Sequence, residues 1–198
     1  DMITKAIMEN VVKYLPKAAE NGADMEAREK MHMAASLGGW MLANSSAHVG
    51  HSLAHVIGGM YHIPHGACCA YSLPVVLEAV SETLPDKVKD IGTILGASYD
   101  GTESAGEIGI KAAEAYKKFA YETVGVKKIT DYVSDEADIK LLADRVVNEP
   151  LAGLSHIFLP FLPRPAPLVP ASGNGRNSYG IVTVAVPSPQ SSSTRNIA

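Results

Sequence analysis

The sequence has little of what a secreted or membrane protein needs. Its 198 residues include only two cysteines, Cys68 and Cys69, which are adjacent and so cannot build a disulfide framework. No apolar run is long enough to cross a bilayer, and no basic and apolar signal peptide opens the chain. We therefore expect a protein of the reducing cytoplasm with no membrane partner.

Positive charge is also scarce. The chain has 17 Lys and Arg residues against 21 Asp and Glu residues, which gives a formal net charge of −4. A nucleic-acid-binding domain usually carries a basic surface that neutralises phosphates. This composition gives such binding no electrostatic support, so we expect no nucleic-acid partner.

Charge and proline divide the chain near Pro150. All 21 acidic residues lie in 1–150, whereas 151–198 contains three arginines and no acidic residue. Eight of the twelve prolines also fall between 150 and 198. A segment of this kind buries too little apolar area to offset its ordering entropy. We predict one domain over 1–150 and an irregular Pro/Ser-rich tail over 151–198.

Helical periodicity and capping residues predict that 1–150 is an all-α helical bundle. No stretch of it alternates in the way that a half-buried strand does. The predicted helices cover 2–15, a segment from Pro16 that stops at Asn21, 25–47 with Asp24 as N-cap, 51–61, 66–81, 85–96, a long helix capped by Thr102 or Ser104, and 134–147. We expect 25–47 to be central, because the small residues from Ala34 to Gly39 let a neighbouring helix approach closely.

The histidines form the most informative pattern of the chain, since six of the seven lie between positions 32 and 65. If 51–61 is helical, His51 and His55 lie on one face, one turn apart. Pro64 ends that helix, and the turn can bring His65 back toward His51. Because imidazole is the commonest metal ligand and a proton carrier near neutral pH, the group predicts a metal or proton-transfer site.

Plainer interpretations of the same side chains stay open. The three clustered histidines can be structural residues of a core. Other polar side chains are predicted to be structural, exposed or packing residues: His32, His48, His62, Cys68 and Cys69. The spacing is not the metalloprotease signature, which needs glutamate after the first histidine, where Ser52 stands here. No glycine-rich nucleotide loop follows a predicted strand.

Around these histidines the chain resembles the iron-containing (group III) alcohol dehydrogenases. Those enzymes carry a stretch of the form His-x-x-x-His-x-x-Gly-x-x-x-x-x-Pro-His-Gly. Its fixed positions are occupied here by His51, His55, Gly58, Pro64, His65 and Gly66. The segments 23–44 and 70–74 resemble those that flank the motif in the family. The resemblance covers roughly residues 1–150.

The resemblance implies a fold and a chemistry. Members of the family join an N-terminal nucleotide-binding α/β domain to a C-terminal all-helical domain, with a divalent ion, Fe²⁺ or Zn²⁺, in the cleft between them. They interconvert small alcohols and aldehydes or ketones with NAD(H) or NADP(H), and the ion polarises the substrate oxygen. His51 and His65 match two metal ligands. His55 matches a histidine that faces the nicotinamide and is implicated in proton transfer.

The chain also departs from the family pattern. The family's other two ligands, an aspartate and a histidine four residues later, lie upstream of the match, and Asp1 is followed at that spacing by Lys5. We therefore expect the helical domain of such a dehydrogenase without its nucleotide-binding domain, inactive alone and prone to form homo-oligomers through exposed apolar area. The alternatives are a fragment of a related zinc enzyme such as glycerol dehydrogenase, and a non-catalytic helical binding or assembly module.

Overall fold

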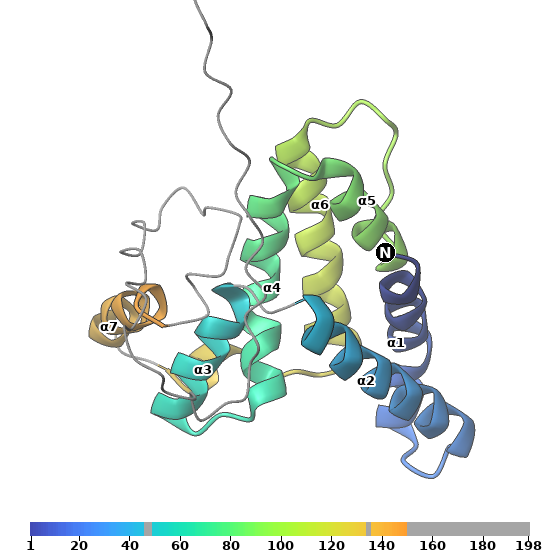
Figure 1. Ribbon diagram of the computed structural model, residues 1–198, viewed down its shortest axis with the longest axis horizontal. Coiled ribbons are helices and arrows are strands. Elements are labelled where there is room, and N and C mark those ends of the chain that lie inside the picture. Colours follow the sequence, from blue (N-terminus) through green and yellow to red (C-terminus); the bar gives the residue numbers. More distant parts are fainter. Residues whose placement is uncertain (46–48, 134–135, 150–198) are drawn as a thin grey trace, which may run out of the picture. The chain divides into compact units, whose positions relative to one another are not determined.

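The computed structural model describes residues 1–45, 49–133 and 136–149, and within these ranges it is helical, with no strand (Figure 1). The elements are α1 (Met2–Glu20), α2 (Met25–Ser45), α3 (Val49–Tyr61), α4 (His65–Ser81), α5 (Pro85–Ile94), α6 (Ala105–Lys117), the π-helical η1 (Lys118–Thr123), the 3₁₀ turn η2 (Ile129–Asp131) and α7 (Glu136–Val147). The predicted all-α class is thereby confirmed. The predicted tail over 151–198 lies outside the described residues. None of the helices in the described ranges is long and apolar enough to span a membrane.

Helix α4 is the element around which the described residues pack. It contacts α3 on one side and α5 and α6 on another, and Figure 1 shows it between α3 and α6. Two buried apolar clusters result. The first joins α3, α4 and α7 through Ala54, Ile57, Ile63, Cys68, Tyr71 and Leu142. The second joins α4, α5 and α6 through Leu77, Val88, Ile108, Ala112 and Ala113.

The contact between α4 and α6 is close because Gly109 has no side chain. A Cβ atom at Gly109 would lie 2.3 Å from Oγ of Ser81 and 2.9 Å from Cα of Glu78. Ser81 is fully buried there and its hydroxyl donates to the carbonyl of Glu78 at 2.7 Å. The small residue that permits a close helix crossing therefore lies in α6.

The prediction that 25–47 forms the central helix is wrong. Ala27 and Ala34 are buried, but Leu37 is 41% exposed and Trp40 is 55% exposed. A Cβ atom at Gly38 or Gly39 would meet nothing within 4 Å, so the two glycines of α2 do not accommodate a neighbouring helix among the described residues. Small side chains permit a close approach without requiring one, and α2 packs instead mainly on α1.

Local capping signals were predicted more accurately than helix packing. The Asp24 carboxylate accepts the backbone N–H of Ala27 at 3.0 Å, as expected of an N-cap. Ser104 and Glu107 form a capping box at the start of α6, which settles the choice between the two predicted caps in favour of serine. Helix α1 runs on through Pro16, so the predicted division of this region into a helix over 2–15 and a separate segment from Pro16 is wrong.

The loop between α5 and α6 is organised by one carboxylate. Oε1 of Glu103 accepts hydrogen bonds from Nζ of Lys111 at 2.6 Å and from the backbone N–H of Asp100 at 2.9 Å. Its Oε2 accepts the N–H of Gly101 at 3.0 Å. The hydrogen bond from Lys111, with those from the backbone, lowers the pKa of Glu103 to about 2.

This lowered pKa predicts how stability depends on pH. Because the carboxylate is favoured in the folded chain, its contribution is present above the ordinary pKa of 4.5 and is lost as the pH falls toward about 2. Glu103→Gln should therefore lower the thermal midpoint at neutral pH, and the difference from wild type should shrink on acidification through this range. The matched control is Glu114→Gln on the exposed side of α6. A wild-type advantage that stays constant from pH 7 to about 2 would contradict the assignment.

Candidate metal centre

The histidines owe their positions to the reversal of the chain between α3 and α4. Helix α3 carries His51 and His55 one turn apart and ends at Tyr61. His62 follows with a φ of +53°, in the left-handed region that non-glycine residues seldom adopt. Ile63 is buried in the first apolar cluster and fixes the turn, and α4 begins directly after Pro64, at His65.

The reversal brings the three imidazoles together. Nε2 of His65 lies 3.3 Å from Nε2 of His51. The ring centroids are 5.1 Å apart for His51 and His65, 5.6 Å for His51 and His55, and 5.5 Å for His55 and His65. One ring nitrogen of each histidine lies within 4.8 Å of the others, and all three rings are partly or well exposed. The predicted return of His65 toward His51 is thus observed.

The third imidazole has a carboxylate partner from far along the chain. Nδ1 of His55 lies 3.1 Å from Oε1 of Glu149, which follows α7 and is 15% exposed. An ionised carboxylate only accepts hydrogen bonds, so Nδ1 of His55 is the donor in this contact. The chain has no Asp, Glu, Lys or Arg from Met31 to Leu77. No residue close to His55 in the sequence could therefore supply a carboxylate to it.

Sequence reasoning missed this role of Glu149. Helix α7 contacts α3, and Leu142 in α7 belongs to the same buried cluster as Ile57. That long-range packing brings the end of α7 to His55. No local pattern around Glu149 signals the contact, because it depends on how two distant helices dock.

The two adjacent cysteines have different surroundings. Cys68 is fully buried, and its thiol donates to the carbonyl oxygen of Ile63 at 3.6 Å, so the prediction that it is a packing residue is confirmed. Cys69 is partly exposed, and its Sγ lies 3.5 Å from Nε2 of His65. Burial raises the pKa of the Cys69 thiol, and the neighbouring Cys68 raises it further.

The remaining predicted histidines lie elsewhere. His32 is exposed on α2, as predicted, and His62 is exposed in the turn between α3 and α4. Neither belongs to the group whose ring nitrogens converge. His48 lies outside the described residues.

Comparison with known proteins identifies the family. The model of the Fe-containing alcohol dehydrogenase family, C-terminal part, matches residues 1–155. The chain belongs to this family. It is 35% identical over 149 residues to the NAD-dependent methanol dehydrogenase of Bacillus methanolicus, a match covering 72% of this chain and 37% of that enzyme. It is 30% identical over 142 residues to the 1,3-propanediol dehydrogenase of Citrobacter freundii, covering 70% of this chain and 36% of that enzyme.

A solved structure supports the same assignment. The alcohol dehydrogenase from Oenococcus oeni superposes with a TM-score of 0.66 at 29% identity, covering 75% of this chain and 38% of that one. The chain therefore corresponds to little more than a third of the length of these iron-containing alcohol dehydrogenases and matches the C-terminal part of the family.

The donor set fits the divalent ion that the family name implies. Imidazole nitrogen suits both iron and zinc among the first-row metals. The three rings present nitrogens close enough to share one ion, and none lies so deep that an ion would be excluded. The roles of His51 and His65 as metal ligands and of His55 as a proton carrier stay predictions.

The metal assignment predicts the effect of removing one imidazole. His51→Ala should weaken binding of Zn²⁺ or Fe²⁺ to the chain by at least about 100-fold, since even indirect partners of a ligand are worth about 10–100-fold. His32→Ala, which removes an exposed histidine from α2, is the control and should leave affinity unchanged. Elemental analysis after anaerobic dialysis measures both. Equal metal content in the two variants would remove His51 from the ligand set.

Proposed function

We propose that this chain supplies the metal-binding helical part of an NAD(P)-dependent alcohol dehydrogenase, which interconverts small alcohols with aldehydes or ketones. The observation that carries the proposal is the convergence of His51, His55 and His65 inside a segment that matches the family over residues 1–155. The relatives named above include a methanol and a 1,3-propanediol dehydrogenase, which supports a small alcohol as substrate.

In this proposal His51 and His65 hold Fe²⁺ or Zn²⁺ through the Nε2 atoms that lie 3.3 Å apart. A bound ion would supply Lewis-acid polarisation of the substrate oxygen, and a bound NAD(P)(H) would accept or supply the hydride. Both imidazoles come from helix positions fixed by the first apolar cluster, so the pair is pre-organised before any ion arrives.

His55 is proposed as the proton carrier. With its Nδ1 hydrogen donated to Glu149, the tautomer is fixed and the basic Nε2 is free to take or give a proton beside the other two rings. Glu149 therefore positions His55 and does not itself touch the substrate.

We propose that the chain alone does not turn over an alcohol. Dinucleotides usually bind at the carboxyl edge of a parallel sheet, and the helices and turns of the described ranges include no strand.

We also propose that the protein works in the cytoplasm, with no nucleic-acid or membrane partner. The grounds are the two adjacent cysteines, the net charge of −4 and the lack of a long apolar run. A fragment of a related zinc enzyme such as glycerol dehydrogenase is the alternative that the donor set equally supports.

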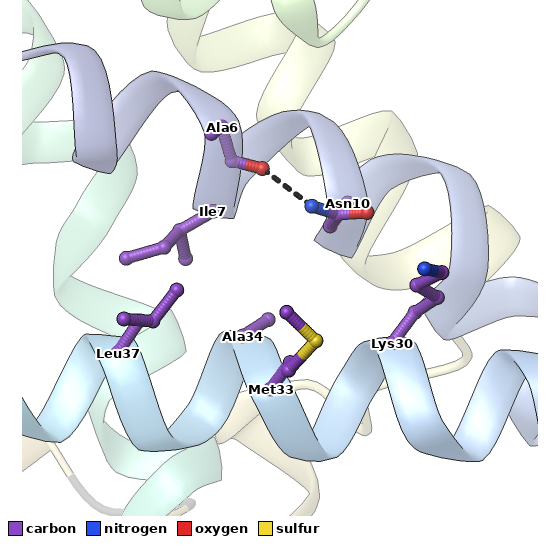
Figure 2. A pocket seen from close by; sticks show the side chains of 7 residues that line it. All are labelled: Ala6, Ile7, Asn10, Lys30, Met33, Ala34 and Leu37. Carbon is purple, nitrogen blue, oxygen red and sulfur yellow. Dashed lines mark hydrogen bonds between the residues drawn. The ribbon is translucent and has the colours of Figure 1, made fainter.

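A second candidate function is a helical assembly module, and the exposed side of α1 and α2 favours it. Met33 and Leu37 are 53% and 41% exposed. Figure 2 shows these two side chains beside Ile7 of α1, in a small pocket between the helices whose rim carries Asn10 and Lys30. An apolar surface of this kind favours a homo-oligomer. Sedimentation as a strict monomer at high concentration would count against this function.

The dehydrogenase proposal predicts activity once the chain is joined to a nucleotide-binding partner. A chimera carrying residues 1–155 in place of the aligned segment of the Bacillus methanolicus enzyme should form NADH from a small alcohol. His55→Gln in that chimera should keep metal content but lower turnover by about 10²–10⁴-fold, because it removes the proton carrier. His32→Gln should change neither. A folded, metal-loaded chimera with no activity on any small alcohol would overturn the proposal.

A further inference from the structure

The second half of α2 is uncovered among the described residues. None of residues 35–45, which we call the α2 end, is buried. Leu37, Trp40 and Leu42 are 41%, 55% and 44% exposed. A Cβ atom at Gly38 or Gly39 would meet nothing within 4 Å. The helix is therefore open here to another protein surface.

The α2 end has the composition of a helix inside a core. It contains no Asp, Glu, Lys or Arg. Trp40 and Leu42 lie on nearly opposite sides of the helix, because they are two positions apart and each residue turns it by about 100°. A helix that is apolar all round is normally buried in a protein core or in a membrane. None of the described helices is long and apolar enough to span a membrane, so a protein surface is the cover that fits.

The polar side chains of the α2 end are already paired within the helix. The hydroxyls of Ser36 and Ser45 donate to the carbonyls of His32 and Met41, at 3.0 and 2.7 Å. The side-chain amide of Asn44 donates to the carbonyl of Trp40 at 2.7 Å. These donors would keep their partners if the α2 end were covered, so its burial would not leave them unsatisfied.

The relatives indicate what the cover is. This chain covers 37% of the methanol dehydrogenase of Bacillus methanolicus and 38% of the Oenococcus oeni structure, and the family model that it matches is the C-terminal part. More than half of each relative therefore has no counterpart in the matched segment. A second copy of this chain fits less well, because a two-fold contact sets one patch against itself and would cover only one side of α2.

We propose that the α2 end is the docking surface for the part of an iron-containing alcohol dehydrogenase that precedes the segment matched here, and that this part encloses Trp40 and Leu42. The inference rests on the proposed function, because it names the partner with which this chain would form the dehydrogenase. The contact is apolar and uncharged on the side of this chain, so the partner surface that fits it is apolar as well.

The test compares Trp40 in the free full-length chain with Trp40 in the chimera described above. Trp40 is the only tryptophan of this chain, and any tryptophan in the bacterial part of the chimera is changed to phenylalanine. Quenching of the fluorescence by acrylamide then measures how accessible the Trp40 ring is. Quenching should be at least about threefold weaker in the chimera, because an enclosed tryptophan is largely buried. The emission maximum should also move to shorter wavelength.

A charged substitution tests the surface itself. Leu42→Glu puts a carboxylate into the proposed contact, and the matched control is Ile110→Glu on α6, where the side chain is 51% exposed. Because an unpaired buried carboxylate is unfavourable, Leu42→Glu should restore most of the quenching in the chimera and lower its thermal midpoint. Ile110→Glu should do neither. In the free chain both variants should keep the wild-type midpoint, since both side chains are exposed there.

The outcomes separate this inference from the proposed function. A chimera that oxidises a small alcohol while Trp40 stays as accessible as in the free chain overturns the docking surface and leaves the dehydrogenase proposal standing. A chimera in which Trp40 is enclosed but no alcohol is oxidised does the reverse.

The free chain alone can also overturn the inference, whether or not the chimera folds. Shielding of Trp40 that grows with protein concentration would make a second copy the occupant. Shielding already present in the dilute chain, or a lowered midpoint of the free Leu42→Glu chain, would show that the α2 end is covered without a partner.

Discussion

The reversal of the chain between α3 and α4 is the constraint on which the rest of the structure depends. Pro64 ends the helical path, and His62 adopts a positive φ that lets the chain turn back on itself. Ile63, between them, is buried in the first apolar cluster and keeps the turn in place. If this short segment were extended, His65 would not face His51, and α3 would not pack on α4.

The same packing builds the core and the candidate metal centre. On α3, Ala54 and Ile57 face the buried cluster, while His51 and His55 lie on the accessible side. The exposure of the rings therefore follows from the burial of their neighbours one or two positions away. Helix α7 joins that cluster through Leu142, and this packing brings Glu149 to His55. The segment 31–77, which contains His55, has no carboxylate of its own.

Much of the fold could be predicted because its signals are local. Asp24, Ser104 and Pro85 mark helix starts through hydrogen bonds or backbone restriction within a few residues, and the structure has helices beginning at each. The spacing of His51 and His55 and the proline before His65 likewise predicted the meeting of the imidazoles. These signals act through the geometry of a single turn of helix.

What could not be predicted depends on how distant helices dock. The exposure of Trp40 on α2 depends on which neighbours that helix contacts, and its small residues are compatible with either outcome. The contact of Glu149 with His55 spans 94 positions of sequence. The different surroundings of Cys68 and Cys69 depend on the rotation of α4 about its axis, because a shift of one residue would exchange them. Composition and spacing contain none of this information.

The central claim is that the reversal between α3 and α4 assembles a centre in which His51 and His65 bind one divalent ion. X-ray absorption spectroscopy of the metal-loaded chain at the zinc edge tests it most directly, because it reports the atoms around the ion. The account predicts at least two imidazole ligands at about 2.0–2.1 Å, and a scattering pattern that loses imidazole contributions in His65→Ala. An ion surrounded only by oxygen, or a spectrum unchanged by that substitution, would contradict it.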